Sequence, residues 1–83
     1  MKHYVDVICI YGKNGSIKPL YIIWDDGSRY PIDRITQIVP AASIYGNGAG
    51  MRYTCLIGSQ YRYLFLEDGK WFVEQIKRSN CVN

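Results

Sequence analysis

Apolar residues along this chain occur in short runs, and a turn signal separates each run from the next. The turns contain pairs such as Asp68-Gly69, whose residues tolerate the positive φ of tight hairpins. No run carries a sustained apolar stripe of helical period; the best helical candidate is a single turn at residues 32–38, before Pro40. The pattern therefore predicts strands at Tyr4–Tyr11, Ile17–Trp24, Ser28–Ile32, Ile35–Ile44, Met51–Ile57, Tyr61–Glu67 and Lys70–Gln75.

The strongest predicted hairpin joins Met51–Ile57 to Tyr61–Glu67 through a three-residue loop, 58–60. In that register Arg52 and Arg62 share one face, and the other face carries the tyrosines: Tyr53, Tyr61 and Tyr63. Both faces are partly apolar, which favours a central hairpin in a strongly curved sheet. We predict an all-β fold, a small six- to seven-stranded antiparallel barrel or roll of SH3-like or OB-like size, with at most one short helical turn.

Composition predicts one small β domain, residues 1–76, followed by a flexible C-terminal tail, residues 77–83. The 83 residues leave room for a single domain, and 48% hydrophobic content argues against disorder. The formal net charge is +3, but Lys77 and Arg78 supply two of these charges. The nearly neutral body lacks the strong basic footprint of an avid nucleic-acid binder.

Three cysteines, without a Cys-x-x-Cys spacing, favour free thiols. Cys9 and Cys55 lie inside apolar runs, where a reduced cysteine behaves as a small hydrophobe; a Cys9–Cys55 disulfide is the alternative. No run approaches the roughly 18 apolar residues of a membrane span, and Asp6 interrupts the apolar region that a signal peptide requires. We therefore expect a cytoplasmic protein without membrane association.

The segment YGNGAGMRY, residues 45–53, has the glycine content of a phosphate-binding loop. Such a loop requires a following helix, whose N-terminal amides hold the phosphate, whereas the residues after Gly50 read as a strand. We expect a connection between two strands. In the alternative hypothesis these residues order against a partner, through Gly46, Asn47, Gly48 and Gly50.

Nothing in the chain predicts an active site. The single histidine, His3, lies at a terminus that should fray. The acidic pairs Asp25-Asp26 and Glu67-Asp68 are explained as turn formers. We predict a non-enzyme with no catalytic residues, no metal and no cofactor.

Arginines interleave with aromatic residues in several of the runs. Small barrels bind single-stranded nucleic acid by stacking bases on aromatic rings while Lys and Arg contact the phosphates. The candidate phosphate contacts are Arg29, Arg34, Arg52 and Arg62. The alternative interpretation places the tyrosine rings in the core and leaves Arg52 and Arg62 as a solvated pair that covers apolar neighbours.

Three blocks together resemble a known family: WDDGSRYPID at 24–33, RYTCLIG at 52–58 and YLFLEDGKWFV at 63–73. That family comprises uncharacterised, stand-alone bacterial proteins of similar length. More loosely, the Trp-x-x-Gly-x-x-Tyr-x-Ile pattern at 24–32 with the late Trp71 is similar to a short all-β domain that accompanies translesion DNA polymerases. Neither resemblance supplies catalytic residues, and the second implies a DNA-repair accessory role.

Two functions stay open from the sequence. The first is a nucleic-acid-associated accessory module, in which Arg29, Arg34, Arg52 and Arg62 contact backbone phosphates. The alternative is a protein-interaction or self-associating module, such as a homodimer, that does not bind nucleic acid. Binding that weakens steeply with salt, and less steeply in Arg52→Ala and Arg62→Ala variants, is predicted by the first alone.

Overall fold

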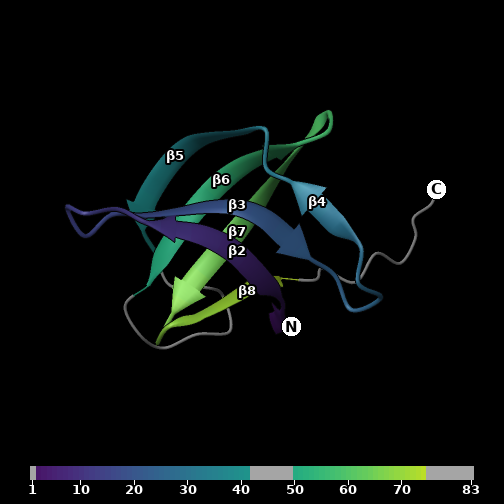
Figure 1. Ribbon diagram of the computed structural model, residues 1–83, viewed down its shortest axis with the longest axis horizontal. Coiled ribbons are helices and arrows are strands. Elements are labelled where there is room, and N and C mark those ends of the chain that lie inside the picture. Colours follow the sequence, from purple (N-terminus) through teal and green to yellow (C-terminus); the bar gives the residue numbers. More distant parts are fainter. Residues whose placement is uncertain (1, 42–49, 75–83) are drawn as a thin grey trace.

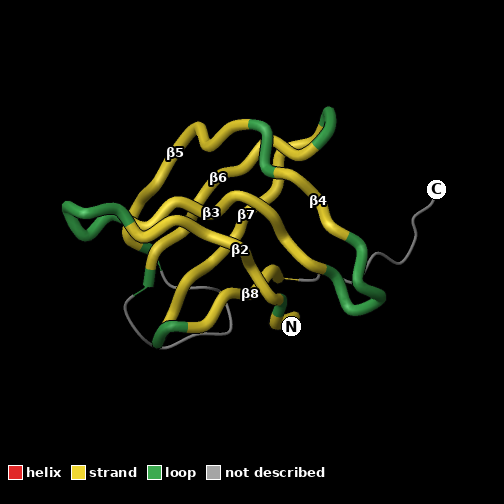
Figure 2. Tube along the Cα trace, in the orientation of Figure 1, coloured by secondary structure: helices red, strands yellow, loops and turns green. Residues whose placement is uncertain are grey.

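The computed structural model describes residues 2–41 and 50–74, which form eight strands and contain no helix (Figures 1 and 2). The strands are β1 (Lys2–Tyr4), β2 (Asp6–Tyr11), β3 (Ile17–Ile23), β4 (Arg29–Pro31), β5 (Arg34–Pro40), β6 (Met51–Ile57), β7 (Gln60–Glu67) and β8 (Lys70–Glu74). Every predicted run contains a strand, and β1 is additional. The helical turn considered for 32–38 is wrong, because the β-branched residues of this segment place it in β5.

The strands form two antiparallel sheets. One has five strands in the order β1-β8-β7-β6-β5, and the other has three in the order β2-β3-β4. The chain passes between them at two bends, Val5 and residues 32–33 (Figure 1). Each bend stays tied to the larger sheet: Val5 N donates to Trp71 O at 3.1 Å, and Asp33 N donates to Leu56 O at 2.8 Å.

These bends make the fold a small all-β roll, which confirms the predicted fold class. The bend at Val5 also explains why eight strands replace the expected six or seven, since it separates β1 from the strand predicted at Tyr4–Tyr11. Among the described residues, β2 forms no strand pairing with β8, and β3 forms none with β5. The roll is therefore not a closed barrel.

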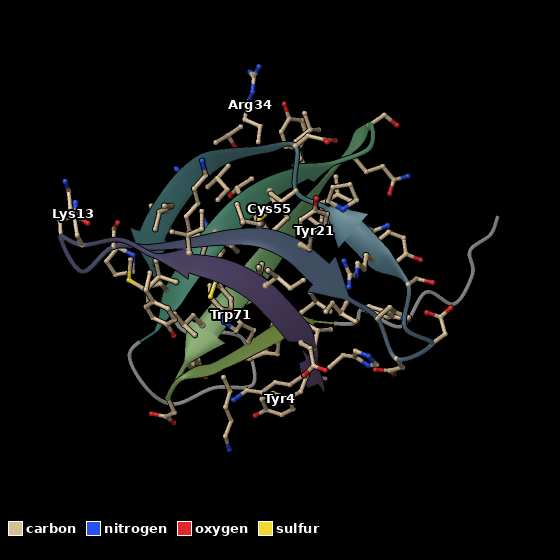
Figure 3. The ribbon with its side chains drawn as sticks, in the orientation of Figure 1. Tyr4, Lys13, Tyr21, Arg34, Cys55 and Trp71 are labelled. Atoms are coloured by element: carbon tan, nitrogen blue, oxygen red, sulfur yellow. The ribbon has the colours of Figure 1, made fainter. Side chains whose placement is uncertain are left out.

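The core lies between the two sheets. Its buried residues are Val5, Ile22, Tyr53, Cys55 and Leu64, and half-buried side chains such as Trp71 pack around them. The rings of Tyr53 and Trp71 lie 5.3 Å apart. In Figure 3, Cys55 and Trp71 lie beneath β2 and β3.

Cys9 and Cys55 are both free thiols, so the alternative of a disulfide between them is wrong. Cys55 is fully buried, and burial raises the pKa of its thiol from 9.0 to about 11. Burial also raises the pKa of Tyr53. A neutral thiol at this position therefore behaves as one more apolar core group.

The Cys55 thiol should make stability depend on pH in the alkaline range. Because its folded-state pKa of about 11 exceeds the unfolded value of 9.0, its contribution is complete below pH 9 and is lost as pH rises toward 11. Urea unfolding at a series of pH values should show this fall, and Cys55→Ala should lose the thiol's part of it. Identical pH profiles for the two proteins would contradict the assignment.

The β6–β7 hairpin differs from the predicted register by one residue. Its turn is Gly58-Ser59 instead of residues 58–60, so that Ile57 pairs with Gln60, and Gly58 has a φ of 61°. Glycine at the first position is typical of a two-residue type II′ turn. The shift exchanges the faces of β7. Arg52 therefore shares a face with Tyr61 and Tyr63, not with Arg62.

Candidate nucleic-acid interface

The face of the five-stranded sheet that points away from the smaller sheet carries a row of aromatic residues. Arg52 pairs with Phe65, Phe65 with Phe72, and Phe72 with Tyr4, so the row crosses β6, β7, β8 and β1. Alternation along β7 adds Tyr61 and Tyr63 to the same face. We call this surface the aromatic face; it consists of Tyr4, Arg52, Tyr61, Tyr63, Phe65 and Phe72.

The rings of the aromatic face contact one another in sequence across the strands. Phe65 and Phe72 stack with centroids 5.2 Å apart, Tyr4 meets Phe72 edge-on at 5.6 Å, and Tyr63 meets Phe65 edge-on at 6.5 Å. Phe65 is 3% exposed and Phe72 is 0% exposed, whereas Tyr63 is 52% exposed. The two phenylalanines thus anchor the face, and the tyrosines offer accessible rings.

Lys2 covers the centre of the row. Its Nζ lies 4.8 Å from the Phe72 ring centroid and 3.1 Å from Glu67 Oε1. The hydrogen bond to Glu67 raises the pKa of Lys2. Glu67 is itself buried, so this ion pair holds Lys2 in place as a structural cover.

The Arg52 side chain lies against the ring of Tyr63. Its guanidinium carbon lies 4.5 Å from the Tyr63 ring centroid, a cation–π contact. Its Nε is buried, as is Oγ1 of neighbouring Thr54, and neither atom has a hydrogen-bond partner among residues 2–41 and 50–74. No carboxylate of those residues forms an ion pair with Arg52. The Arg52 guanidinium therefore places positive charge beside an accessible ring, while its Nε is closed to solvent.

Two further cations lie near the edges of this face. Lys70 Nζ is 6.0 Å from the Tyr4 ring centroid. Arg34 pairs with Leu56, which alternates with the buried Cys55, and its side chain extends away from the body of the molecule (Figure 3). These positions place positive charge at both ends of the aromatic face.

The structure therefore places two of the four predicted arginines, Arg34 and Arg52, on the same face of the larger sheet. Arg62 pairs with the buried Cys55, so it belongs to the opposite face, and it donates to Gln60 Oε1 at 2.7 Å. Arg29 is exposed on β4, in the smaller sheet. The predicted sharing of one face by Arg52 and Arg62 is wrong, because it depended on the three-residue loop.

Of the glycine-loop candidates, Gly46, Asn47 and Gly48 lie outside the described residues. Gly50 lies just before β6, and its carbonyl accepts a hydrogen bond from Ala41 N at 2.9 Å. A Cβ at this position would overlap Glu67 Cγ and would lie 3.0 Å from the Leu66 carbonyl oxygen. Close packing against β7 thus accounts for glycine at residue 50.

Gly50→Ala should destabilise the fold by about 1–3 kcal/mol, the usual range for overpacking. The methyl group would displace Glu67 and with it the ion pair to Lys2. The midpoint of urea denaturation measures the effect. Gly15→Ala is the control for loss of glycine, because no atom lies within 4 Å of its Cβ position and only its φ of 88° opposes substitution. Unchanged stability in Gly50→Ala would contradict the packing role.

His3 is ordered within β1, so the expectation of a frayed terminus is wrong at this residue. Its ring stacks on Trp24 with centroids 4.5 Å apart, and Nε2 lies 3.1 Å from Asp25 Oδ2.

Asp26 acts as the expected turn former: Ser28 N donates to its Oδ1 at 2.9 Å, which lowers the pKa of Asp26. Packing and turn formation account for all three side chains.

Two shallow hollows mark the seams where the sheets separate. One, of about 480 Å³, lies between the start of β3 and β5; the other, of about 550 Å³, lies between β2 and β8. Neither seam gathers metal ligands, and no group of three or more His, Cys, Asp or Glu residues within 2–41 and 50–74 is placed to hold a metal ion. The candidate site is therefore the aromatic face, of which the three tyrosines are exposed.

Tyr4, Lys70 and Phe72 were not predicted as part of a site. Their neighbours across the sheet are distant in sequence, since β1 pairs with β8. The correct register of the β6–β7 hairpin could have been predicted from the sequence. Gly58-Ser59 suits a two-residue turn, and this turn directs the apolar side chains of Leu64 and Leu66 toward the core.

In comparisons with known proteins, no protein-family model, curated protein or solved structure matches the chain. The resemblances described from the sequence stay predictions. Among the described residues there is no helix long and apolar enough to cross a membrane.

Proposed function

We propose that this protein is a non-enzymatic module that binds single-stranded nucleic acid through its aromatic face. The observation that carries the proposal is the Arg52 guanidinium, which lies 4.5 Å from the ring of the 52% exposed Tyr63. This arrangement places a positive charge, which attracts phosphate, directly beside a ring that can stack on a base.

Single strands fit this surface better than a duplex. Stacking on tyrosine requires bases whose faces are free, which a duplex does not offer. Tyr4, Tyr61 and Tyr63 are accessible, and Arg34 and Lys70 extend the positive charge to either side. Only a few cations contribute, so the affinity should be moderate and strongly dependent on salt.

A cytoplasmic DNA-repair accessory role is the setting that we propose. It is supported by the loose similarity to the domain that accompanies translesion polymerases, which implies an accessory role in DNA repair. Free Cys9 and Cys55 are compatible with a reducing compartment. A protein partner at the aromatic face is the competing outcome of the experiment below.

The experiment is fluorescence anisotropy with a labelled single-stranded oligonucleotide over a range of salt concentrations. The logarithm of the association constant should fall linearly with the logarithm of salt, and Arg52→Ala should reduce the slope by about 0.7, the value for one phosphate contact on a single strand. Arg62→Ala is the matched control, because Arg62 lies on the other face, and it should leave the slope unchanged.

Absence of binding by the wild type at low salt would refute the proposal. Equal effects of Arg52→Ala and Arg62→Ala would refute the assignment of the binding face.

A further inference from the structure

The smaller sheet is apolar on both of its faces. Its inner face contributes residues such as Val7 and Ile22 to the core. Its outer face, at the front in Figure 1, carries a set of apolar side chains that we call the apolar stripe. By the strand register, the apolar stripe consists of Ile8, Ile10, Tyr21, Ile23 and Pro31.

The apolar stripe is open to solvent. Ile8 is 36% exposed, Ile10 is 51% exposed and Tyr21 is 38% exposed. A solvent-facing side of an antiparallel sheet normally carries polar residues, and strands that are apolar on both sides are normally covered on both. A contiguous exposed apolar patch of this kind marks an interaction surface.

The charges that border the stripe have a specific arrangement. Asp6 pairs with Ile23, and Ile23 pairs with Arg29, so one row across the sheet reads acid, apolar, base. The next row, Ile8-Tyr21-Pro31, is apolar throughout. Asp6 and Arg29 are exposed, and neither forms an ion pair with the other described residues.

We propose that the apolar stripe binds a second copy of this chain, face to face, about a twofold axis parallel to the central strand β3. This axis places β2 over the partner's β4, so that Asp6 faces the partner's Arg29 and Arg29 faces the partner's Asp6. Tyr21 and Ile23 meet their own counterparts. The row is therefore self-complementary in charge and in apolar character, which a twofold interface requires.

Other occupants fit the charge pattern less well. A nucleic acid would meet a mainly apolar surface with an exposed carboxylate, Asp6, at its border. A twofold axis perpendicular to the strands would instead set Asp6 over the partner's Ile10 and Ile23 over the partner's Lys18. With the axis along β3, Lys18 faces its own counterpart near the end of that strand and beyond β4, where the two long side chains can turn away from each other into solvent.

This dimer would leave the aromatic face free, because the two faces belong to different sheets and point in opposite directions. The stripe consists of five apolar side chains, whereas a standard stable interface has roughly 20–30 residues on each side. We therefore expect a concentration-dependent dimer with a dissociation constant on the order of 10–100 µM.

Sedimentation velocity over a series of protein concentrations tests the proposal. The wild type should pass from monomer to dimer as concentration rises, and Asp6→Lys or Arg29→Glu should each raise the dissociation constant roughly tenfold or more. The double variant Asp6→Lys/Arg29→Glu should restore dimerisation, because it re-forms both pairs with their signs exchanged. Tyr63→Ala, on the aromatic face, should leave it unchanged.

A wild type that stays monomeric throughout would overturn the proposal. So would a dimer that is insensitive to both single variants, or a double variant that dimerises no better than the single ones. Circular dichroism of each variant shows whether it is folded, and these exposed positions should tolerate the changes. The test does not depend on nucleic-acid binding, so the two proposals can fail separately.

Discussion

Tyr63→Ala is expected to weaken binding of a single-stranded oligonucleotide by roughly 5- to 150-fold, the equivalent of about 1–3 kcal/mol for one stacked base. The change removes an accessible ring and also the group against which the Arg52 guanidinium lies at 4.5 Å. The affinity measured by anisotropy should therefore fall by more than it does in Arg52→Ala. Tyr63→Phe should restore most of the affinity, since phenylalanine retains the stacking surface.

Tyr30 provides a matched control for the loss of an exposed tyrosine. It lies on β4, in the smaller sheet, and is 43% exposed. Tyr30→Ala should bind the oligonucleotide as the wild type does. If Tyr30→Ala and Tyr63→Ala weaken binding equally, the aromatic face is not the specific site.

Phe72→Ala is expected to cost about 3–5 kcal/mol of stability, the range for removing a fully buried aromatic side chain. Phe72 is 0% exposed, stacks on Phe65 and supports Tyr4. A domain of this size has roughly 4–12 kcal/mol of total stability, so the variant should be close to unfolding. Urea denaturation followed by circular dichroism measures the loss.

Tyr4→Ala is the comparison for Phe72→Ala. Tyr4 contacts Phe72 from the neighbouring strand but is 53% exposed, so truncation should cost about 1 kcal/mol or less. Similar losses in the two variants would show that Phe72 does not anchor the aromatic face.

The strands themselves were predictable from local signals. Turn residues such as Asp68-Gly69, both with positive φ, delimit apolar runs, and each run holds a strand. The bend at Val5 was not predictable, because it lies within a predicted strand and is fixed by a hydrogen bond to the distant Trp71. The break at residues 32–33 was predicted as the gap between the runs Ser28–Ile32 and Ile35–Ile44, but the change of sheet at this point was not. The pairing of β1 with β8 has the same long-range origin.

The candidate site depended on register, where an error of one residue reverses the result. The identities of Arg52 and Tyr63 were evident from sequence, but the assumed three-residue loop placed them on opposite faces. The two-residue turn at Gly58-Ser59 places them together, with Thr54 opposite Tyr63. Since side chains alternate between the two faces of a strand, a register error of one residue moves every side chain of β7 to the wrong face.

The most direct test of the proposed function is an NMR titration of the uniformly ¹⁵N-labelled protein with a single-stranded oligonucleotide at low salt. The largest amide shifts should lie on β6, β7 and their neighbours on the aromatic face, including Arg52 and Tyr63, and should saturate together. Shifts confined to the smaller sheet, or no shifts at all at excess oligonucleotide, would contradict binding through the aromatic face.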